Sequence, residues 1–355
     1  MISYEDIINY SLKFNIPVID VIFIALNRYG VKYGEKEDRM RFVLTPNMHD
    51  EDFFFALGVN TSKTPFEIID NKLYMDKEEI GIITDMERDT CSETYFRKNK
   101  QAMTLNSNSR STCAGCRFCG TYKLSSEERE NFSNEDEIVS FIGDLLKEND
   151  LNDLKQMESI TVCTGCFKTE RDLVNHLILL RKAFDRFNFN GEIRYIGSQI
   201  QTMDSLYRIK DEIGKFGLLV TTEKFVGREE IMRKEKANLT LELSKEFLKK
   251  AGDLGFESTF LYILGLEELK IVKKYMEYMK DSVNKFPIIQ IYQNYTRSQE
   301  DYRCKEAKNL EYYLKARKML EEIFYEEYFS PESWENYRSL YYTEFKGNPY
   351  KKVRI

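Results

Sequence analysis

Three cysteines, Cys113, Cys116 and Cys119, follow one another at intervals of three residues in one short segment. Thiolates this close together suit three corners of a single iron-sulfur cubane, because separate metal ions would crowd each other there. The chain has seven cysteines, and an odd total argues against a framework of disulfides. The segment therefore predicts a [4Fe-4S] cluster with these three thiolates as its metal ligands.

The fourth iron of such a cluster has no nearby protein ligand. A bacterial ferredoxin sequence places a fourth cysteine a few residues further on, followed by proline, but Lys123 and Leu124 stand there. The next cysteine along the chain is Cys163. One iron is thus expected to be open to a small ligand. The alternative is a structural zinc site completed by Cys91 or Cys163, although zinc usually takes ligand pairs from two separated knuckles.

From about residue 100, strand patterns alternate with helix patterns, which is typical of a parallel sheet covered by helices. The expected strands are short and mostly apolar: Ala102–Leu105, Ser159–Cys163, Ile193–Ile196, Leu218–Thr222, Ser258–Leu264 and Ile288–Tyr292. A complete barrel needs eight such units, so six units predict an α/β fold with a partial (β/α)6 TIM-like barrel that is open on one side. Ligands of parallel sheets collect at the carboxyl ends of the strands, where the cysteine segment lies.

Helical periodicity supports this arrangement. One apolar stripe runs from Ile138 to Leu146 behind an approximate capping box of Ser133 and Asp136, and a second runs from Leu173 to Phe184. Further helices are expected near residues 203–215, 228–251, 267–282 and 300–327. The last of these interleaves Tyr with Glu, Lys and Arg, which indicates a solvated outer face.

The chain is expected to divide into three parts. Residues 1–98 predict a small N-terminal α+β domain, residues 99–328 the barrel, and residues 329–355 an aromatic-rich C-terminal extension. The β-prone segments of the first part are Met40–Leu44, Phe66–Ile69 and Gly81–Thr84, with turn residues at Asn60 and at Asp70 and Asn71.

The cysteine loop resembles the cluster loop of the radical S-adenosylmethionine superfamily. The resemblance covers about residues 100–300 and includes the order of strands and helices as well as Phe118, directly before the third cysteine. The sequence departs from the commonest pattern in having two residues, rather than three, between Cys113 and Cys116. The family implies that S-adenosylmethionine chelates the open iron through its amino and carboxylate groups.

The resemblance also implies a set of cofactor-binding residues at the strand ends, closest in pattern to the biotin-synthase-like branch. These are Phe118, Thr164, Gly165, Cys166, Ser198, Glu223, Arg228, Leu264 and Tyr292. Glycine allows close backbone approach to a ligand, and a carboxylate with a guanidinium can grip ammonium, hydroxyl and carboxylate groups. For Glu223 and Arg228, a surface salt bridge is the alternative interpretation.

The catalytic residues stay unknown, with Cys163 and Cys166 as candidates. This second Cys-x-x-Cys pair could ligate an auxiliary cluster together with Cys91 and Cys304, or could donate a hydrogen atom to a substrate radical. The alternative is that both are small packing residues, since free cysteine is among the most buried residue types.

The implied activity is reductive cleavage of S-adenosylmethionine to a 5′-deoxyadenosyl radical that abstracts a hydrogen atom from a substrate. A small molecule is the expected substrate, a peptide is the second choice, and a flavodoxin or ferredoxin is the expected reductant. The motif does not specify the outcome of the reaction, which could be that of a lyase, of a mutase, or of an enzyme that forms sulfur or carbon bonds. A non-catalytic iron-sulfur electron carrier or sensor is the alternative from another class of protein.

Composition and missing motifs narrow the other possibilities. The formal charge of −6 argues against nucleic acid as a partner, because such binding needs clustered Lys and Arg. The apolar stretch from Pro17 to Leu26 contains Asp20 and is too short for a bilayer, so a cytoplasmic protein without a membrane partner is expected. No Walker loop, dinucleotide glycine motif or Ser-His-Asp arrangement is present, and His176 is expected to be structural.

Overall fold

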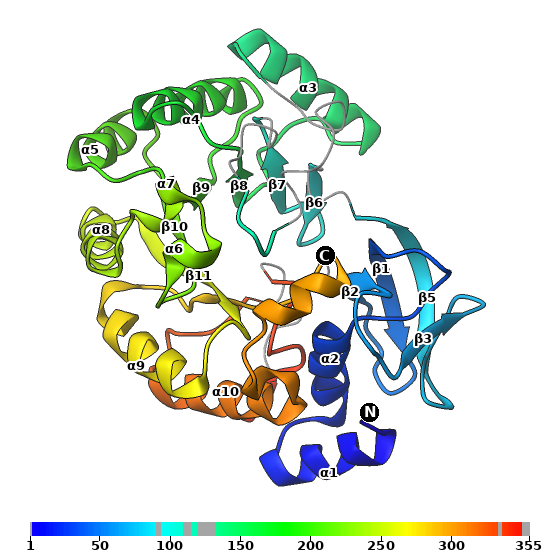
Figure 1. Cartoon of the computed structure of the whole chain (residues 1–355). Coiled ribbons are helices and arrows are strands. Elements are labelled where there is room, and N and C mark those ends of the chain that lie inside the picture. Colours follow the sequence, from blue (N-terminus) through cyan, green and yellow to red (C-terminus); the bar gives the residue numbers. More distant parts are fainter. Residues whose placement is uncertain (1, 90–93, 109–114, 120–131, 333–335, 350–355) are drawn as a thin grey trace.

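The computed structural model describes residues 2–89, 94–108, 115–119, 132–332 and 336–349. It has a mixed α/β fold in which two curled sheets, one of five strands and one of seven, lie side by side (Figure 1). A small hairpin of β13 (Glu344–Phe345) and β14 (Asn348–Pro349) follows near the C-terminus.

The seven-stranded sheet contains six parallel strands that neighbour one another in chain order. They are β7 (Ala102–Asn106), β8 (Ser159–Cys163), β9 (Glu192–Gly197), β10 (Phe216–Glu223), β11 (Glu257–Leu264) and β12 (Ile288–Ile291). All six expected strands are confirmed, with their ends within two residues of the expected positions. One short strand was not expected: β6 (Tyr95–Arg97) pairs antiparallel with β7, which makes the sheet mixed. The sheet does not close on itself, because β6 and β12 form its two edges.

Helices cover the outer face of this sheet (Figure 1). They are α3 (Glu135–Glu148), α4 (Glu170–Asp185), α5 (Met203–Glu212), α8 (Leu241–Asp253), α9 (Leu269–Met279) and α10 (Leu310–Ile323). Helix α3 begins one residue later than the capping box predicted. Its N-cap is Asn134, whose side chain accepts from the Glu137 backbone, while Ser133 donates to the Glu137 carboxylate.

The prediction of a single helix over residues 228–251 is wrong. The segment forms α6 (Arg228–Ile231), α7 (Lys234–Ala237) and α8 instead. Met232 takes an extended backbone conformation that ends α6, and the Thr240 side chain caps a new helix by accepting from the Leu243 backbone. The break lets Arg233 donate to the Gly115 carbonyl in the cysteine loop.

The expected helix over residues 300–327 is shorter, and its solvated outer face is confirmed as a narrow stripe of Glu311, Lys315, Lys318 and Glu322. Two turns of 3-10 helix, Arg297–Tyr302 and Glu306–Lys308, precede α10. Helix α10 buries residues around most of its circumference, including Tyr313, Leu314 and Arg317. Tertiary packing explains this burial, since α10 packs against both α9 and the N-terminal helix α2 (Val18–Tyr29).

The N-terminal segment contains α1 (Tyr4–Phe14), α2 (Val18–Tyr29) and a five-stranded antiparallel sheet. Its strands are β1 (Asp38–Pro46), β2 (Phe53–Val59), β3 (Phe66–Ile69), β4 (Lys72–Met75) and β5 (Glu78–Arg88), of which β2 and β4 were not expected. The expected turn between β3 and β4 is confirmed by left-handed φ angles of 48° and 59° at Asp70 and Asn71. In the described part of the chain no single helix has the length and apolarity to cross a bilayer; only α1 and α2 together reach that threshold, across a bend of 119°.

The N-terminal sheet lies along the open side of the seven-stranded sheet (Figure 1). It contacts the β12 edge, where Arg39 donates to the Gln293 side chain at 3.1 Å and Asn294 donates to the Thr61 carbonyl at 2.7 Å. It also reaches the β6 edge, where the Arg41 guanidinium lies 5.7 Å from the Tyr95 ring centroid. The N-terminal sheet therefore borders the region enclosed by the parallel strands.

Candidate functional site

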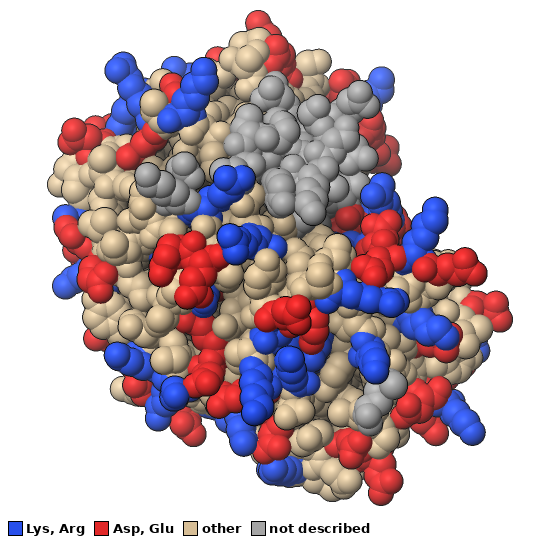
Figure 2. Space-filling view, in the orientation of Figure 1, with Lys and Arg blue, Asp and Glu red and all other residues tan. Residues whose placement is uncertain are grey.

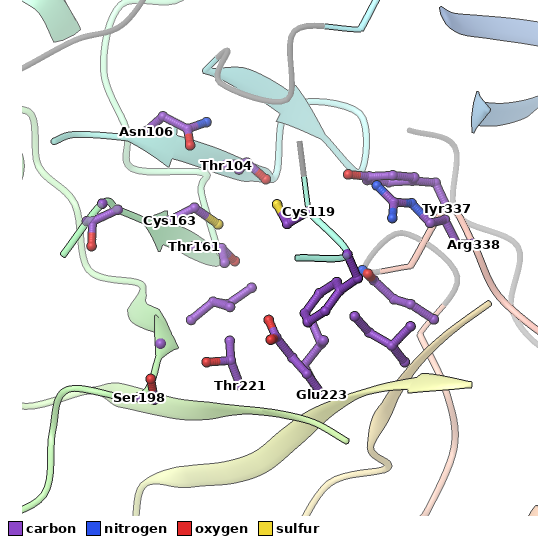
Figure 3. Close-up of a pocket in the computed structure, with 18 of the residues that line it drawn as sticks. Thr104, Asn106, Cys119, Thr161, Cys163, Ser198, Thr221, Glu223, Tyr337 and Arg338 are labelled. Atoms are coloured by element: carbon purple, nitrogen blue, oxygen red, sulfur yellow. The ribbon is translucent and has the colours of Figure 1, made fainter. Parts of the chain in front are cut away.

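A cavity of about 290 Å³ lies inside the curled sheet at the carboxyl ends of the strands (Figure 3). Side chains alternate between the two faces of a strand, so its inner wall is built from residues two apart. These pairs are Thr104 and Asn106 on β7, Thr161 and Cys163 on β8, Thr221 and Glu223 on β10, Leu261 and Ile263 on β11, and Gln290 with Tyr292 at the end of β12. The site lies where parallel sheets usually bind ligands.

The structure brings most of the sequence-predicted site residues to this cavity. The lining includes Phe118, Cys119, Cys163, Thr164, Gly165, Cys166, Ser198, Glu223 and Tyr292. Arg228 is buried beside the wall without lining it, and Leu264 lies in the core between sheet and helices. Cys113 and Cys91 lie outside the described residues. Cys304 lies outside the cavity lining, and its thiol donates to the Glu267 carbonyl at 3.1 Å.

The described part of the cysteine loop, residues 115–119, is held from two sides. The Cys119 N–H donates to the Cys116 carbonyl at 3.0 Å, which closes a tight turn. On one side, the Arg117 N–H donates to the Ile231 carbonyl at 2.8 Å, and Arg233 Nε donates to the Gly115 carbonyl at 2.8 Å. The loop is therefore fixed to the broken helical segment after β10.

On its other side, the cysteine loop is held by the 3-10 turn that follows β12. Gln299 Nε2, in the 3-10 turn after β12, donates to the Arg117 carbonyl at 2.9 Å. The side chains of Cys116 and Phe118 then pack on the inner wall, in an apolar cluster with Leu219 and Leu261. The loop thus covers one end of the cavity, and the sulfurs of Cys119 and Cys163 both point into the enclosed space (Figure 3).

Cys116 is 6% exposed, and its burial raises the pKa of the thiol to about 11. A thiolate at this position needs a compensating positive charge, which a bound iron would supply. Among the described residues there is no group of three or more His, Cys, Asp or Glu arranged to hold a metal ion. Two of the three predicted cluster ligands, Cys116 and Cys119, belong to that described part.

Glu223 lines the cavity and has an unusual backbone conformation. The pairing of β10 with β11 shifts register between Thr221 and Glu223, and Glu223 has a left-handed φ of 61°. Thr221 and Glu223 both face the cavity, as residues two apart in a strand do. Lys236 donates to Glu223 Oε1 at 2.6 Å, whereas Oε2 is buried and has no partner among the described residues.

Arg228 is the first residue of α6 and is 5% exposed, so it is not part of a surface salt bridge. Its Nη2 donates to the Lys236 carbonyl at 3.0 Å, while Nε and Nη1 have no partner in the described part of the chain. Burial lowers the pKa of the guanidinium, and the nearby Glu223 and Cys116 oppose this shift. Polar atoms that lack partners among the described residues therefore gather near the cysteine loop, where a polar ligand would satisfy them.

The loops that follow β7, β8 and β9 are joined by hydrogen bonds. The Gly165 N–H donates to the Asn108 carbonyl at 3.2 Å, and the Gln199 side chain bonds both the N–H and the carbonyl of Phe167 at 3.0 and 2.9 Å. Behind them, Ser107 and the buried His176 share a hydrogen bond of 2.8 Å, and burial lowers the pKa of His176 to about 4. These contacts agree with a structural role for His176.

Sequence reasoning missed Glu267, which joins two strand-end loops. Its carboxylate accepts from the backbone N–H groups of Phe225 and Val226, each at 2.8 Å, and from the Tyr262 hydroxyl at 2.8 Å. Burial raises its pKa. Glu267 therefore holds the loop between Glu223 and Arg228 in place. Its only sequence signal is a carboxylate just beyond an apolar strand.

The cavity wall contributed by the two ends of the chain was also missed. It consists of Arg41, Phe54, Asp89, Tyr95, Arg97, Tyr337 and Arg338. Nothing in their spacing marks them, because they come from β1, β2, β6 and the segment after residue 335. Only the tertiary arrangement brings them to the strand ends.

No known protein-family model matches this chain, and a search of curated proteins finds no relative.

Proposed function

We propose that the protein is a radical S-adenosylmethionine enzyme whose parallel strands form a partial (β/α)6 barrel. The observation that carries the proposal is the seating of Cys116 and Cys119 at the strand-end cavity, beside buried polar atoms of Glu223 and Arg228 that lack protein partners among the described residues. Cluster ligation by Cys113, Cys116 and Cys119 would leave one iron for S-adenosylmethionine.

The donor set of the site suits both groups. When bound, the reduced cluster and S-adenosylmethionine would supply a 5′-deoxyadenosyl radical that removes a hydrogen atom from the substrate. Glu223 Oε2 would accept from hydroxyl or ammonium groups of the cofactor, and Phe118 would pack on its adenine. Arg228 supports the part of the site around Glu223, because it donates to the carbonyl of Lys236, the residue that pairs with Glu223.

The walls around the cavity would limit the access of water to the site. The cysteine loop, the β10 loop and the terminal segments surround the cavity and exclude water, which protects a reactive intermediate from solvent. A cavity of about 290 Å³ lies at the lower end of the size range of small-molecule sites, so we propose a small-molecule substrate.

The proposal includes a cytoplasmic location and a flavodoxin or ferredoxin as reductant, since the cysteines must stay reduced. On the face seen in Figure 2, Lys and Arg side chains alternate with Asp and Glu rather than gathering in a basic stripe. Together with the net charge of −6, this mixed surface favours a small molecule over nucleic acid.

The test is anaerobic reconstitution with iron and sulfide, followed by dithionite and S-adenosylmethionine, with detection of 5′-deoxyadenosine. We expect release by the wild-type protein and loss in Cys116→Ala. The matched control is Cys304→Ser, which keeps a donor for the Glu267 carbonyl outside the cavity and should retain release. Bound zinc, or a reduced cluster whose electron paramagnetic resonance spectrum ignores S-adenosylmethionine, would contradict the proposal in favour of the structural-zinc or electron-carrier alternatives.

A further inference from the structure

Gln299 uses both ends of its side-chain amide. Its Oε1 accepts from the backbone N–H groups of Tyr295 and Thr296, at 2.7 and 3.3 Å, which shapes the start of the 3-10 turn Arg297–Tyr302. Its Nε2 donates away from the turn, to the Arg117 carbonyl in the cysteine loop at 2.9 Å. Because the amide is planar and two donors hold its oxygen, the turn sets the direction of the bond to the loop.

Asn294 attaches this turn to the N-terminal segment. Its side chain is 2% exposed, and Nδ2 donates to the Thr61 carbonyl, in the loop after β2, at 2.7 Å. The same Nδ2 donates to the Thr296 carbonyl at 2.9 Å, while Oδ1 accepts from the Ser62 hydroxyl at 3.1 Å. Asn294 therefore joins the start of the turn to the loop beside the N-terminal sheet.

Two charged side chains of the turn make further contacts with the N-terminal segment. Arg297 Nε lies 3.0 Å from the Glu37 carboxylate and donates to the Asn60 carbonyl at 3.1 Å. Glu300 accepts from the buried Arg28 on α2 at 2.9 Å. The N-terminal segment thus holds the turn on both sides of its centre.

The N-terminal sheet also approaches Asn294 closely. At Gly58 on β2, a Cβ atom would lie 2.9 Å from the Asn294 carbonyl oxygen and 2.5 Å from Thr61 Oγ1. Both distances are shorter than van der Waals contact, so the absence of a side chain lets the strand lie against the backbone of Asn294. A side chain at position 58 would push the sheet and Asn294 apart.

We infer that the N-terminal sheet positions the cysteine loop, with the turn Arg297–Tyr302 as the connecting element and Gln299 as the positioning residue. Contacts with Ile231 and Arg233 hold the loop on its other side, so loss of the Gln299 bond should loosen the loop without detaching it. The inference adds to the proposed function and rests on it only for the role of the cysteines as cluster ligands.

The test is alkylation of Cys116 by iodoacetamide in the reduced, metal-free, full-length protein, followed by mass spectrometry of the modified peptide. Cys116 is 6% exposed, so its thiol reacts only when the loop opens. Gln299→Glu keeps an acceptor for the N–H groups of Tyr295 and Thr296 but loses the donor to the loop. Alkylation should become about fivefold faster, the factor that loss of one hydrogen bond gives.

Further variants separate the charge, the sheet and the background. Gln299→Ala is uncharged and loses both ends of the amide, so it should speed alkylation at least as much. Gly58→Ala presses on the Asn294 carbonyl rather than on the cysteine loop, and it should also speed the reaction. Arg297→Ala, at a side chain that is 73% exposed, should have a smaller effect in the same direction. Gln101→Glu, at an exposed position before β7, is the matched control and should leave the rate unchanged.

Two results would overturn the inference. One is a wild-type alkylation rate of Cys116 in both Gln299 variants. The other is a wild-type rate in both Gly58→Ala and Arg297→Ala, or acceleration confined to variants whose thermal unfolding temperature is lowered, since that would report a general loss of stability. Because the assay uses metal-free protein, either result leaves 5′-deoxyadenosine release as an independent test of the proposed function.

Discussion

Among single residues, Glu223 combines backbone strain with a buried oxygen that has no partner among the described residues. A left-handed conformation costs a non-glycine residue on the order of 1 kcal/mol, and such strain concentrates where a side chain must be aimed at a ligand. Here the strained residue lines the cavity. Stability and ligand binding should therefore respond differently to substitution at this position.

We expect Glu223→Gly to unfold within about 1 kcal/mol of the wild type, because glycine accepts the positive φ and offsets the lost contact with Lys236. The same variant should lose most of its affinity for S-adenosylmethionine, measured by equilibrium dialysis after reconstitution. Glu223→Gln should keep part of that affinity. Full affinity in the glycine variant would remove Glu223 from the proposed site.

His176 predicts a pH dependence of stability. Burial lowers its folded pKa to about 4, below the ordinary value of 6.5, so the unfolded chain binds the proton more readily. The favourable contribution of the neutral ring is complete above pH 6.5 and is lost as the pH falls toward 4. Between pH 7 and pH 5 this loss amounts to about 2 kcal/mol.

His176→Gln keeps a hydrogen-bonding group near Ser107 but does not titrate, so its free energy of unfolding should fall less between pH 7 and pH 5. Urea unfolding at the two pH values measures the difference between variant and wild type. Carboxylates titrate in both proteins and cancel in that difference. Equal pH slopes would show that folding does not lower the pKa of His176.

At the level of helices and strands, the parallel strands could be predicted from the sequence. Once a strand is placed, the alternation of its side chains predicts which residues face inward. Short apolar runs such as Ser159–Cys163 predict buried parallel strands, and alternation then directs Thr161 and Cys163 to one face. The sequence did not indicate that residues 228–251 form three helices rather than one. Its helical propensity was overruled by tertiary contacts, since Ile231 and Arg233 hold the cysteine loop.

Glu267 is the contact between elements that we expect to be most sensitive to substitution. Glu267→Ala leaves the N–H groups of Phe225 and Val226 without an acceptor, which should cost about 3 kcal/mol of unfolding free energy. Glu267→Gln retains one acceptor oxygen and should cost less. The control is Glu268→Ala, because the Glu268 side chain is 49% exposed and pairs with a surface lysine.

Thermal and urea unfolding measure these differences. Binding of S-adenosylmethionine should weaken in Glu267→Ala as well, because the loop between Glu223 and Arg228 would lose its anchor. Equal stability of the Glu267→Ala and Glu268→Ala variants would contradict this account of the loop.

For the whole molecule, a buried ion pair joins distant parts of the chain. Arg317 on α10 donates to Asp20 on α2, and both side chains are fully buried. Asp20 also accepts from the backbone N–H groups of Tyr342 and Thr343, while Arg317 donates to the Leu340 carbonyl. The pair thereby fixes the segment that carries Arg338.

Asp20→Ala should destabilise the protein by about 4 kcal/mol, because it leaves a buried guanidinium without its carboxylate. The double variant Asp20→Leu, Arg317→Leu should recover much of that loss. The exposed pair of Lys13 and Glu311 joins α1 to α10, and Glu311→Ala should cost less than about 1 kcal/mol. Urea unfolding of the four proteins completes the comparison, and a small effect of Asp20→Ala would contradict it.

The limit of sequence reasoning lies at this largest scale. The open side of the sheet was expected from six strand-helix units, yet no periodicity indicates that the N-terminal sheet and the segment after residue 335 border it. Asp20 interrupts an apolar run and could have signalled a buried partner, but its partner stands 297 positions away. Long-range pairs of this kind leave no local pattern.

A wall assembled from Arg41 and Arg338 also constrains how the protein matures. On the ribosome, Arg41 emerges long before Arg338, so the pocket stays incomplete through most of translation. If the proposed cluster is bound, its insertion into a complete site would have to wait until the segment of Arg338 has docked. Under the proposed function, this order would keep radical chemistry from starting before the walls of the site are complete.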